Sequence, residues 1–238
     1  MLWVAVLAGP AVAGPPYLSD DPQPTPYREY EIYLFAAGER GLGGSAGAYG
    51  VDFNYGGAPD LQLTAVVPLA WERASAQDTV RGVGNVELAA KYRFVKPATG
   101  GVGWYAAVFP RVFLASASEA VGDQHPSLLL PLWLQYQWSG ASTFGGGGCT
   151  LTRGDEVKNS CTLSWAVTKD VGPGIALGVE LQHQTPDAEG ARSSSVAGVG
   201  VTYVAADHLQ VLAYGNRGLQ HRDETPRTGW YAALLFTF

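Results

Sequence analysis

Charged side chains are scarce in this 238-residue sequence, and the usual signs of a helical membrane protein or a nucleic-acid-binding protein are missing. Only 15% of the residues are charged, against about a quarter in soluble domains. Beyond the first residues there is no run of 18 apolar residues, which excludes a membrane-spanning helix. The formal net charge is −6 and no basic stripe occurs, so we expect no nucleic-acid partner.

Glycine and aromatic residues are abundant, a composition that favours short strands and tight turns. The sequence has 31 glycines, and 11% of its residues are aromatic. Residues 84–94 alternate, with Glu87, Lys91 and Arg93 on one face and apolar residues such as Leu88 on the other. A period of two with charges on one face indicates a strand between two different solvents. In a membrane barrel the apolar face contacts lipid and the polar face lines the lumen.

The same alternation recurs along the chain, in segments close to the ~10 residues that a tilted membrane-spanning strand needs. The clearest segments are 60–72, 84–94, 128–138, 175–184 and 230–238, and weaker ones are 28–37, 45–55, 102–114, 142–150, 161–168, 195–205 and 208–216. We therefore predict an all-β fold, an up-and-down antiparallel transmembrane β-barrel of about twelve strands in the bacterial outer membrane.

Short and long connections alternate between these segments, which favours a barrel over a sandwich. Short turns are expected at residues 56–59, 96–101, 139–142, 169–174 and 205–207. Longer polar connections are expected at residues 38–44, 72–82, 115–126, 151–160, 185–193 and 216–228. Outer-membrane barrels have short periplasmic turns and long extracellular loops, whereas a Greek-key sandwich mixes loop lengths. A secreted soluble β-sandwich is the alternative.

The chain begins with an apolar run that ends in Ala11-Val12-Ala13, the small-x-small pattern of a signal-peptidase site. We predict a signal peptide at residues 1–13, a proline-rich periplasmic lead-in at residues 14–27 and the barrel at residues 28–238. The prolines of the lead-in exclude a helix or a central strand there. The sequence leaves open whether the lead-in folds into the mouth of the barrel.

Cys149 and Cys161 bracket a polar stretch and would oppose each other at the top of a hairpin. Because disulfides persist in exported proteins, we predict that the two cysteines are bonded. No histidine lies near either cysteine, and no histidine elsewhere has a companion at metal-ligand spacing. The sequence predicts no metal site and no cofactor.

Charged side chains on the inward face are the candidate functional residues. The alternation of side chains along each predicted strand places seven of them on this face: Glu29, Glu31, Glu87, Lys91, Arg93, Arg111 and Glu180. Such charges either line a wet pore and set its solute preference or pair across the lumen as a structural plug. We predict a passive channel for small solutes, surrounded by outer-membrane lipid, with a plugged barrel as the first alternative. We also expect the barrel-assembly machinery to act on the C-terminal strand, which ends in Phe238.

An outer-membrane hydrolase is the competing class of protein. His125 and Ser127 lie at the edge of a long loop, but a proline stands between them and no Asn-bearing strand motif orients the histidine. Asp207 and His208 are adjacent rather than spaced on one face, and they fall at an expected turn. We therefore predict that the protein is not an enzyme and keep the hydrolase as an alternative.

Four short phrases resemble those of a known family. They are Ser19-Asp20-Asp21-Pro22, an expected turn at Asn54-Tyr55-Gly56, an expected strand start at Pro59-Asp60-Leu61-Gln62-Leu63, and Lys91-Tyr92-Arg93-Phe94. With the residues between them they are similar to the Putative MetA-pathway of phenol degradation family, bacterial outer-membrane proteins often labelled transporters. The resemblance implies an outer-membrane location and passage of small compounds, aromatic ones among them.

Overall fold

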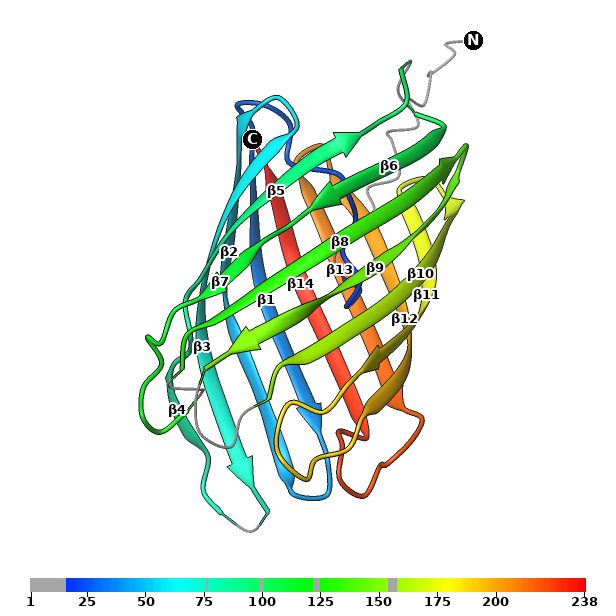
Figure 1. Ribbon diagram of the computed structural model, residues 1–238. Coiled ribbons are helices and arrows are strands. Elements are labelled where there is room, and N and C mark those ends of the chain that lie inside the picture. Colours follow the sequence, from blue (N-terminus) through cyan, green and yellow to red (C-terminus); the bar gives the residue numbers. More distant parts are fainter. Residues whose placement is uncertain (1–15, 76, 99–100, 122–124, 154–157) are drawn as a thin grey trace.

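The computed structural model describes residues 16–75, 77–98, 101–121, 125–153 and 158–238, which form a closed barrel of tilted strands (Figure 1). The predicted signal peptide, residues 1–13, lies outside the described residues. The strands are β1 (Tyr30–Arg40), β2 (Gly44–Ala58), β3 (Leu61–Ala74), β4 (Val80–Val83), β5 (Glu87–Val95), β6 (Gly103–Val108), β7 (Arg111–Phe113), β8 (Ser127–Trp138), β9 (Ala141–Thr152), β10 (Ser160–Gly172), β11 (Ile175–Gln184), β12 (Ser194–Ala206), β13 (Leu209–Gly218) and β14 (Thr228–Thr237).

Two barrel strands are interrupted, so these fourteen segments make twelve antiparallel barrel strands. β4 and β5 both pair with β3, and β6 and β7 both pair with β5 and β8. Pro110 lies between β6 and β7, where its missing N–H breaks the ladder. β1 pairs with β14 from Glu31↔Thr237 to Arg40↔Thr228, which closes the sheet and removes its edges. The prediction of an up-and-down barrel of about twelve strands is confirmed.

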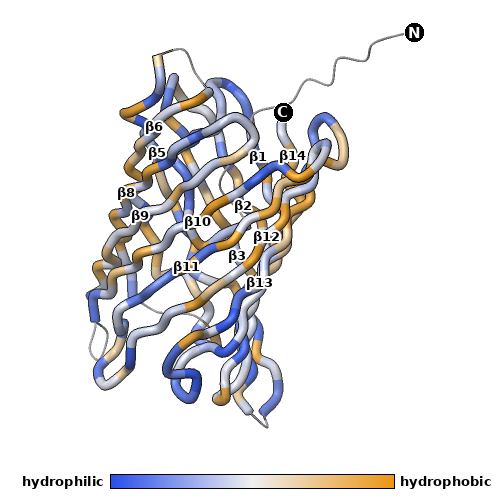
Figure 2. The backbone as a smooth tube through the Cα atoms, turned by 90° about the vertical axis from the view of Figure 1, so that its right-hand side faces the viewer, coloured by the Kyte–Doolittle hydropathy of each residue, from blue (hydrophilic) through white to orange (hydrophobic). Residues whose placement is uncertain are grey.

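The barrel wall shows the alternation that the sequence predicts. In β5, Leu88 and Tyr92 are about half exposed, whereas Glu87 and Lys91 are buried. The same contrast separates outward and inward residues in β8 and β11, and Figure 2 shows hydrophobic residues spread along the wall. An exposed apolar belt around a closed barrel suits the hydrocarbon core of a bilayer. No helix in the described part of the chain is long and apolar enough to cross a membrane. The chain is a β-barrel of the bacterial outer membrane.

The two ends of the barrel differ in their connections. Short turns at residues 59–60, 139–140, 173–174 and 207–208, with the longer connection 96–102, lie at the end where the chain terminates (Figure 1). The other end carries the connections 41–43, 75–79, 114–126, 153–159, 185–193 and 219–227. Because short turns are usually periplasmic, we assign the first end to the periplasm and call it the turn end; the second is the loop end.

Two local expectations are wrong. The connection expected at residues 38–44 is only residues 41–43, because β1 continues to Arg40 and pairs with β2 to that point. The turn expected at Asn54-Tyr55-Gly56 is part of β2, which continues to Ala58 with an irregular register near Gly56. The Asn54 side chain bonds to lumen side chains instead of stabilising a turn.

One side of the lumen is apolar rather than polar. Tyr33, Leu212 and Leu235 are buried together on β1, β13 and β14, and Phe35 and Tyr231 pack against them. Most of the charged inward residues lie on other strands, and Glu31 at the start of β1 is an exception.

The disulfide predicted between Cys149 and Cys161 is confirmed, and it joins opposed residues of β9 and β10 near the loop end. Because the bond closes a short loop, the entropy model gives about 3 kcal/mol of stabilisation. We expect the paired replacement Cys149→Ser and Cys161→Ser to lower the denaturant midpoint of the refolded barrel without changing its β content. Reductant should lower the midpoint of the parent protein to that of the variant and leave the variant unaffected. An unchanged midpoint in the variant would show that the bond adds no stability.

Candidate functional site

Residues 16–27, the described part of the proline-rich lead-in, run inside the barrel; we call them the lumen segment (Figure 1). Ser19, Asp21 and Thr25 are each at most 2% exposed, although they belong to no strand. The segment turns back at the barrel rim, where Tyr27 bridges Gly56 and the Arg28 amide donates to the Gly56 carbonyl at 2.8 Å. The extended lead-in thus folds into the lumen, a possibility that the sequence left open.

Tyr17 anchors the inner end of the lumen segment. Its ring makes edge-on contacts with Phe144 and Tyr214, at centroid distances of 5.7 and 5.8 Å, and its hydroxyl donates to the Gly200 carbonyl at 3.2 Å. The ring lies against the wall at Gly178 and Gly200, where a Cβ on either glycine would overlap the tyrosine. Two neighbouring strands therefore need glycine at these inward positions to make room for Tyr17.

Glu180 holds the backbone beside this anchor. Its carboxylate accepts hydrogen bonds from the amides of Leu18 at 3.0 Å and of Ser19 at 2.5 Å. Bonds from backbone N–H groups to an ionised carboxylate are stronger than neutral ones. A single inward side chain of β11 therefore fixes two consecutive residues of the lumen segment.

The Ser19-Asp20-Asp21-Pro22 phrase forms a tight turn within the lumen. The Asp21 carboxylate accepts a hydrogen bond from the backbone N–H of Gln23 at 2.5 Å, and the Asp20 carboxylate accepts one from the backbone N–H of Asp21 at 2.7 Å. This is the local bonding by which aspartate stabilises turns. Asp20 also forms an ion pair with Lys91 at 2.8 Å, which ties the turn to β5. Burial raises the pKa of Asp21 to about 7, against the lowering effect of Lys91.

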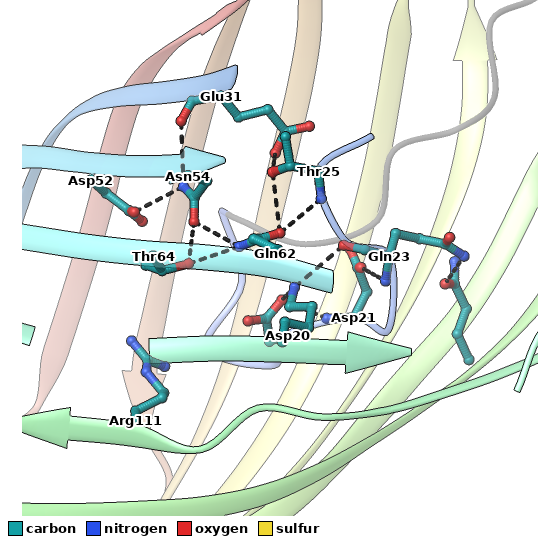
Figure 3. Close-up of polar contacts among 12 residues, drawn as sticks. Asp20, Asp21, Gln23, Thr25, Glu31, Asp52, Asn54, Gln62, Thr64 and Arg111 are labelled. Carbon is teal, nitrogen blue, oxygen red and sulfur yellow. Dashed lines mark hydrogen bonds and ion pairs between the residues drawn. The ribbon is translucent and has the colours of Figure 1, made fainter. Parts of the chain in front are cut away.

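Side-chain amides connect the rest of the lumen segment to the wall. Gln23 donates to Gln135 at 2.9 Å and accepts from Arg93. The Thr25 amide donates to the Gln62 side chain at 2.9 Å, and the Thr25 hydroxyl donates to Glu31 at 3.1 Å. Figure 3 shows this network continuing from Gln62 along the wall to the side chains of β2 and β3.

Ion pairs complete the turn-end half of the lumen. Arg111 binds Glu87 through two hydrogen bonds of 2.7 and 2.8 Å. Arg93 binds Asp60 at 2.6 Å, so the wall cations nearest the lumen segment are already neutralised.

Two cavities remain in the lumen, one on each side of Tyr17 and Leu18. The turn-end cavity has a volume of about 820 Å³ and the loop-end cavity about 780 Å³. Tyr17, Leu18 and Tyr231 line both of them. The lumen segment, which is held to the wall by non-covalent contacts up to its junction with β1, therefore lies between two chambers that are each large enough for a small solute.

The structure gathers five of the seven charged residues singled out from the sequence. Glu31, Glu87, Lys91, Arg93 and Arg111 line the turn-end cavity. Glu180 also points inward, but its carboxylate is occupied by the lumen segment.

Glu29 lies just before β1 and is exposed. Its expected position on the lumen face stays a prediction. Contact of each of the seven residues with a passing solute also stays a prediction.

The residues most important for holding the lumen segment were missed from the sequence. Tyr17 and Asp20 precede the first strand and carry no strand periodicity. The alternation of residues 60–72 places Gln62 on the inward face, but it does not mark Gln62 as a partner of the lead-in. Gly178 and Gly200 are a weak sequence signal of the contact with Tyr17. Both lie on the inward face of their strands, where a glycine leaves room for a side chain from another part of the protein.

Two of the places considered for hydrolysis lie at opposite ends of the barrel. Ser127 begins β8, and its backbone pairs with Phe113 and Thr152. Asp207 and His208 form the exposed β12–β13 turn at the turn end, remote from the loop end where a surface protease would act. Within the described ranges, no group of three or more His, Cys, Asp or Glu side chains is placed to hold a metal ion.

Comparisons with known proteins agree with this architecture. An outer membrane channel from Pseudomonas putida F1 is similar at 12% identity with a TM-score of 0.73, over 91% of this chain and 97% of that chain. The KdgM porin matches at 12% identity with a TM-score of 0.60, over 87% and 99%. The NanC porin matches at 8% identity with a TM-score of 0.59, over 86% and 98%. These identities are low, so the likeness shows the fold alone.

No curated protein sequence matches the chain. The profile of one family does match, and it spans residues 39–236, which include nearly all of the barrel. The chain therefore belongs to the family described as Putative MetA-pathway of phenol degradation.

Proposed function

We propose that this protein is an outer-membrane channel for small solutes, and that the lumen segment closes it in the state described above. The observation that carries the proposal is the pair of cavities, about 820 and 780 Å³, that meet at Tyr17 and Leu18 of the lumen segment and at Tyr231 of the wall. A barrel built as a solid structural element would fill its interior with wall side chains, as small barrels do. Here a stretch of chain that belongs to no barrel strand fills the middle.

The chemistry of the turn-end cavity is compatible with small aromatic compounds. Tyr105 and Phe109 line it beside the cations Arg93 and Lys91, whose charged groups lie 5.8 and 4.8 Å from the ring centroids. An aromatic solute can stack on such rings. The family description, which refers to phenol degradation, supports the same class of solute.

Single-channel recording of the refolded protein tests the proposal. We expect the full chain to show small or brief currents and a variant lacking residues 16–26 to show larger, steady currents, because the two cavities would then join. Heat-modifiable migration of both proteins on gels controls for folding. A folded deletion variant that carries no current would contradict the channel and favour a structural barrel.

A further inference from the structure

The cations of the turn-end lumen are all neutralised by carboxylates. Lys91 pairs with Asp20 at 2.8 Å, Arg93 with Asp60 at 2.6 Å and Arg111 with Glu87 at 2.7 Å. Asp60 and Glu87 belong to the wall, so Arg93 and Arg111 keep their carboxylates when the lumen segment leaves. Lys91 then loses Asp20, but Glu180 loses the backbone amides of Leu18 and Ser19 at the same time, so undocking frees one cationic and one acidic side chain of the wall. Arg93 and Arg111 are therefore poor candidates for attracting an anion.

Glu31 and Asp52, which also line this chamber, are not balanced in this way. Glu31 of β1 accepts a hydrogen bond from the Thr25 hydroxyl at 3.1 Å, and Asp52 of β2 accepts one from the Asn54 amide at 2.9 Å. Both partners are neutral, and in the part of the chain that the structure describes neither carboxylate forms an ion pair within 4 Å. Figure 3 shows both side chains on neighbouring strands of one wall, and both line the turn-end cavity.

The loop-end cavity has a charge excess of the same sign. Its charged lining residues are Glu39, Asp187, Arg192 and Glu224. The single cation in this set, Arg192, is paired with Glu224 at 3.3 Å. A solute that crosses the barrel therefore passes two chambers that are both lined by more carboxylates than cations.

We propose that the open lumen selects cationic and neutral small solutes over anions, with Glu31 and Asp52 as the determinants of that selectivity. The inference rests on the proposed channel function and names its solute class. Unpaired carboxylates on the wall of a narrow pore attract cations and repel anions, because the low-dielectric surroundings strengthen Coulomb interactions. Rings of acidic side chains select cations in other channels by the same physics.

The test is the reversal potential of the full-length refolded chain under a KCl gradient at pH 8. We expect K⁺ to permeate more readily than Cl⁻, and we expect the double variant Glu31→Gln, Asp52→Asn to lower that permeability ratio by roughly threefold or more at low salt. Both amides can still accept the hydrogen bonds from Thr25 and Asn54, so the wall network is retained. The matched control is Glu189→Gln, which removes one charge from an exposed loop residue and should leave the ratio unchanged.

The outcomes separate this inference from the channel itself. A chloride-selective parent, or a ratio that the double variant does not change, would overturn the inference while leaving the channel intact. If neither the parent nor the variant lacking residues 16–26 conducts, both the channel and its selectivity are wrong. If the double variant does not fold, either single variant can replace it in the same measurement. The swelling rates of proteoliposomes in lysine and in glutamate, which are similar in size and opposite in charge, test the same selectivity on the parent protein.

Discussion

Replacing Tyr17 with alanine should open the lumen and raise the conductance of the barrel without unfolding it. The ring packs between Phe144 and Tyr214 and against two glycines, so its removal eliminates the largest apolar contact of the lumen segment. Tyr17 is only partly buried, and we expect a loss of about 2 kcal/mol, below the range for fully buried aromatic residues. That loss would raise the population of undocked segments by a factor of roughly thirty. The open probability of single channels measures it directly.

The wall side of the same contact provides a matched test. Tyr17→Phe keeps the ring and loses only the hydrogen bond to Gly200, so its conductance should stay close to that of the parent. Gly200→Val places a side chain against Tyr17 and Pro16, which both belong to the lumen segment, and it should reproduce the effect of Tyr17→Ala from the opposite side. Equal conductance in Tyr17→Ala and in the parent, with both folded, would show that this anchor does not hold the segment in place.

The barrel itself could be read from the sequence because its cause is local. Each strand has lipid on one side and the lumen on the other, so polar and apolar residues such as Glu87 and Leu88 alternate along it. This pattern occurs within each strand and does not depend on the other strands. Strand interruptions were less visible. The break before β5 lies opposite Pro68 of the neighbouring β3, which has no backbone N–H to donate, and no pattern within β5 indicates it.

The site could be predicted only on its wall side. Parity placed Lys91 and Arg93 inside, but their partners Asp20 and Gln23 lie about seventy residues earlier in a stretch without periodicity. Glu180 is separated from its partners Leu18 and Ser19 by more than 160 residues. Contacts of this kind depend on the closed shape of the barrel, and the short-range pattern of the lead-in does not contain them.

The four phrases that resemble the family meet at the lumen segment in the folded protein. Lys91 and Arg93 of the fourth phrase contact Asp20 and Gln23, and Gln62 of the third contacts Thr25. Gly56 of the second lets the carbonyl of Pro26 approach so closely that a Cβ would overlap it. The phrases therefore describe one assembly, the seat of the lumen segment, rather than four separate turns and strands.

Raising the pH from about 4 to about 7 should weaken the docking of the lumen segment and increase the open probability. Burial raises the pKa of Asp21 from its ordinary value of 3.8 to about 7 in the docked state, and the nearby carboxylates Asp20 and Glu31 oppose the lowering effect of Lys91. Below about pH 4 Asp21 is protonated whether the segment is docked or free, so docking carries no penalty. Between pH 4 and 7 Asp21 is deprotonated in the free segment and protonated in the docked segment, so docking weakens as the pH rises. Above about pH 7 Asp21 is deprotonated in both states, and the docking equilibrium changes no further.

Asp21→Asn isolates this contribution, because the amide oxygen can still accept the hydrogen bond from Gln23 while the side chain no longer titrates. Each pKa unit between the docked and free states corresponds to a tenfold change in the docking equilibrium, so we expect the parent's open probability to change at least tenfold across the window. The variant should stay near the parent's low-pH value throughout. The measurement is the open probability of both proteins between pH 4 and 8. If the open probability of the parent falls as the pH rises, or if the variant has the same pH profile as the parent, Asp21 does not control docking.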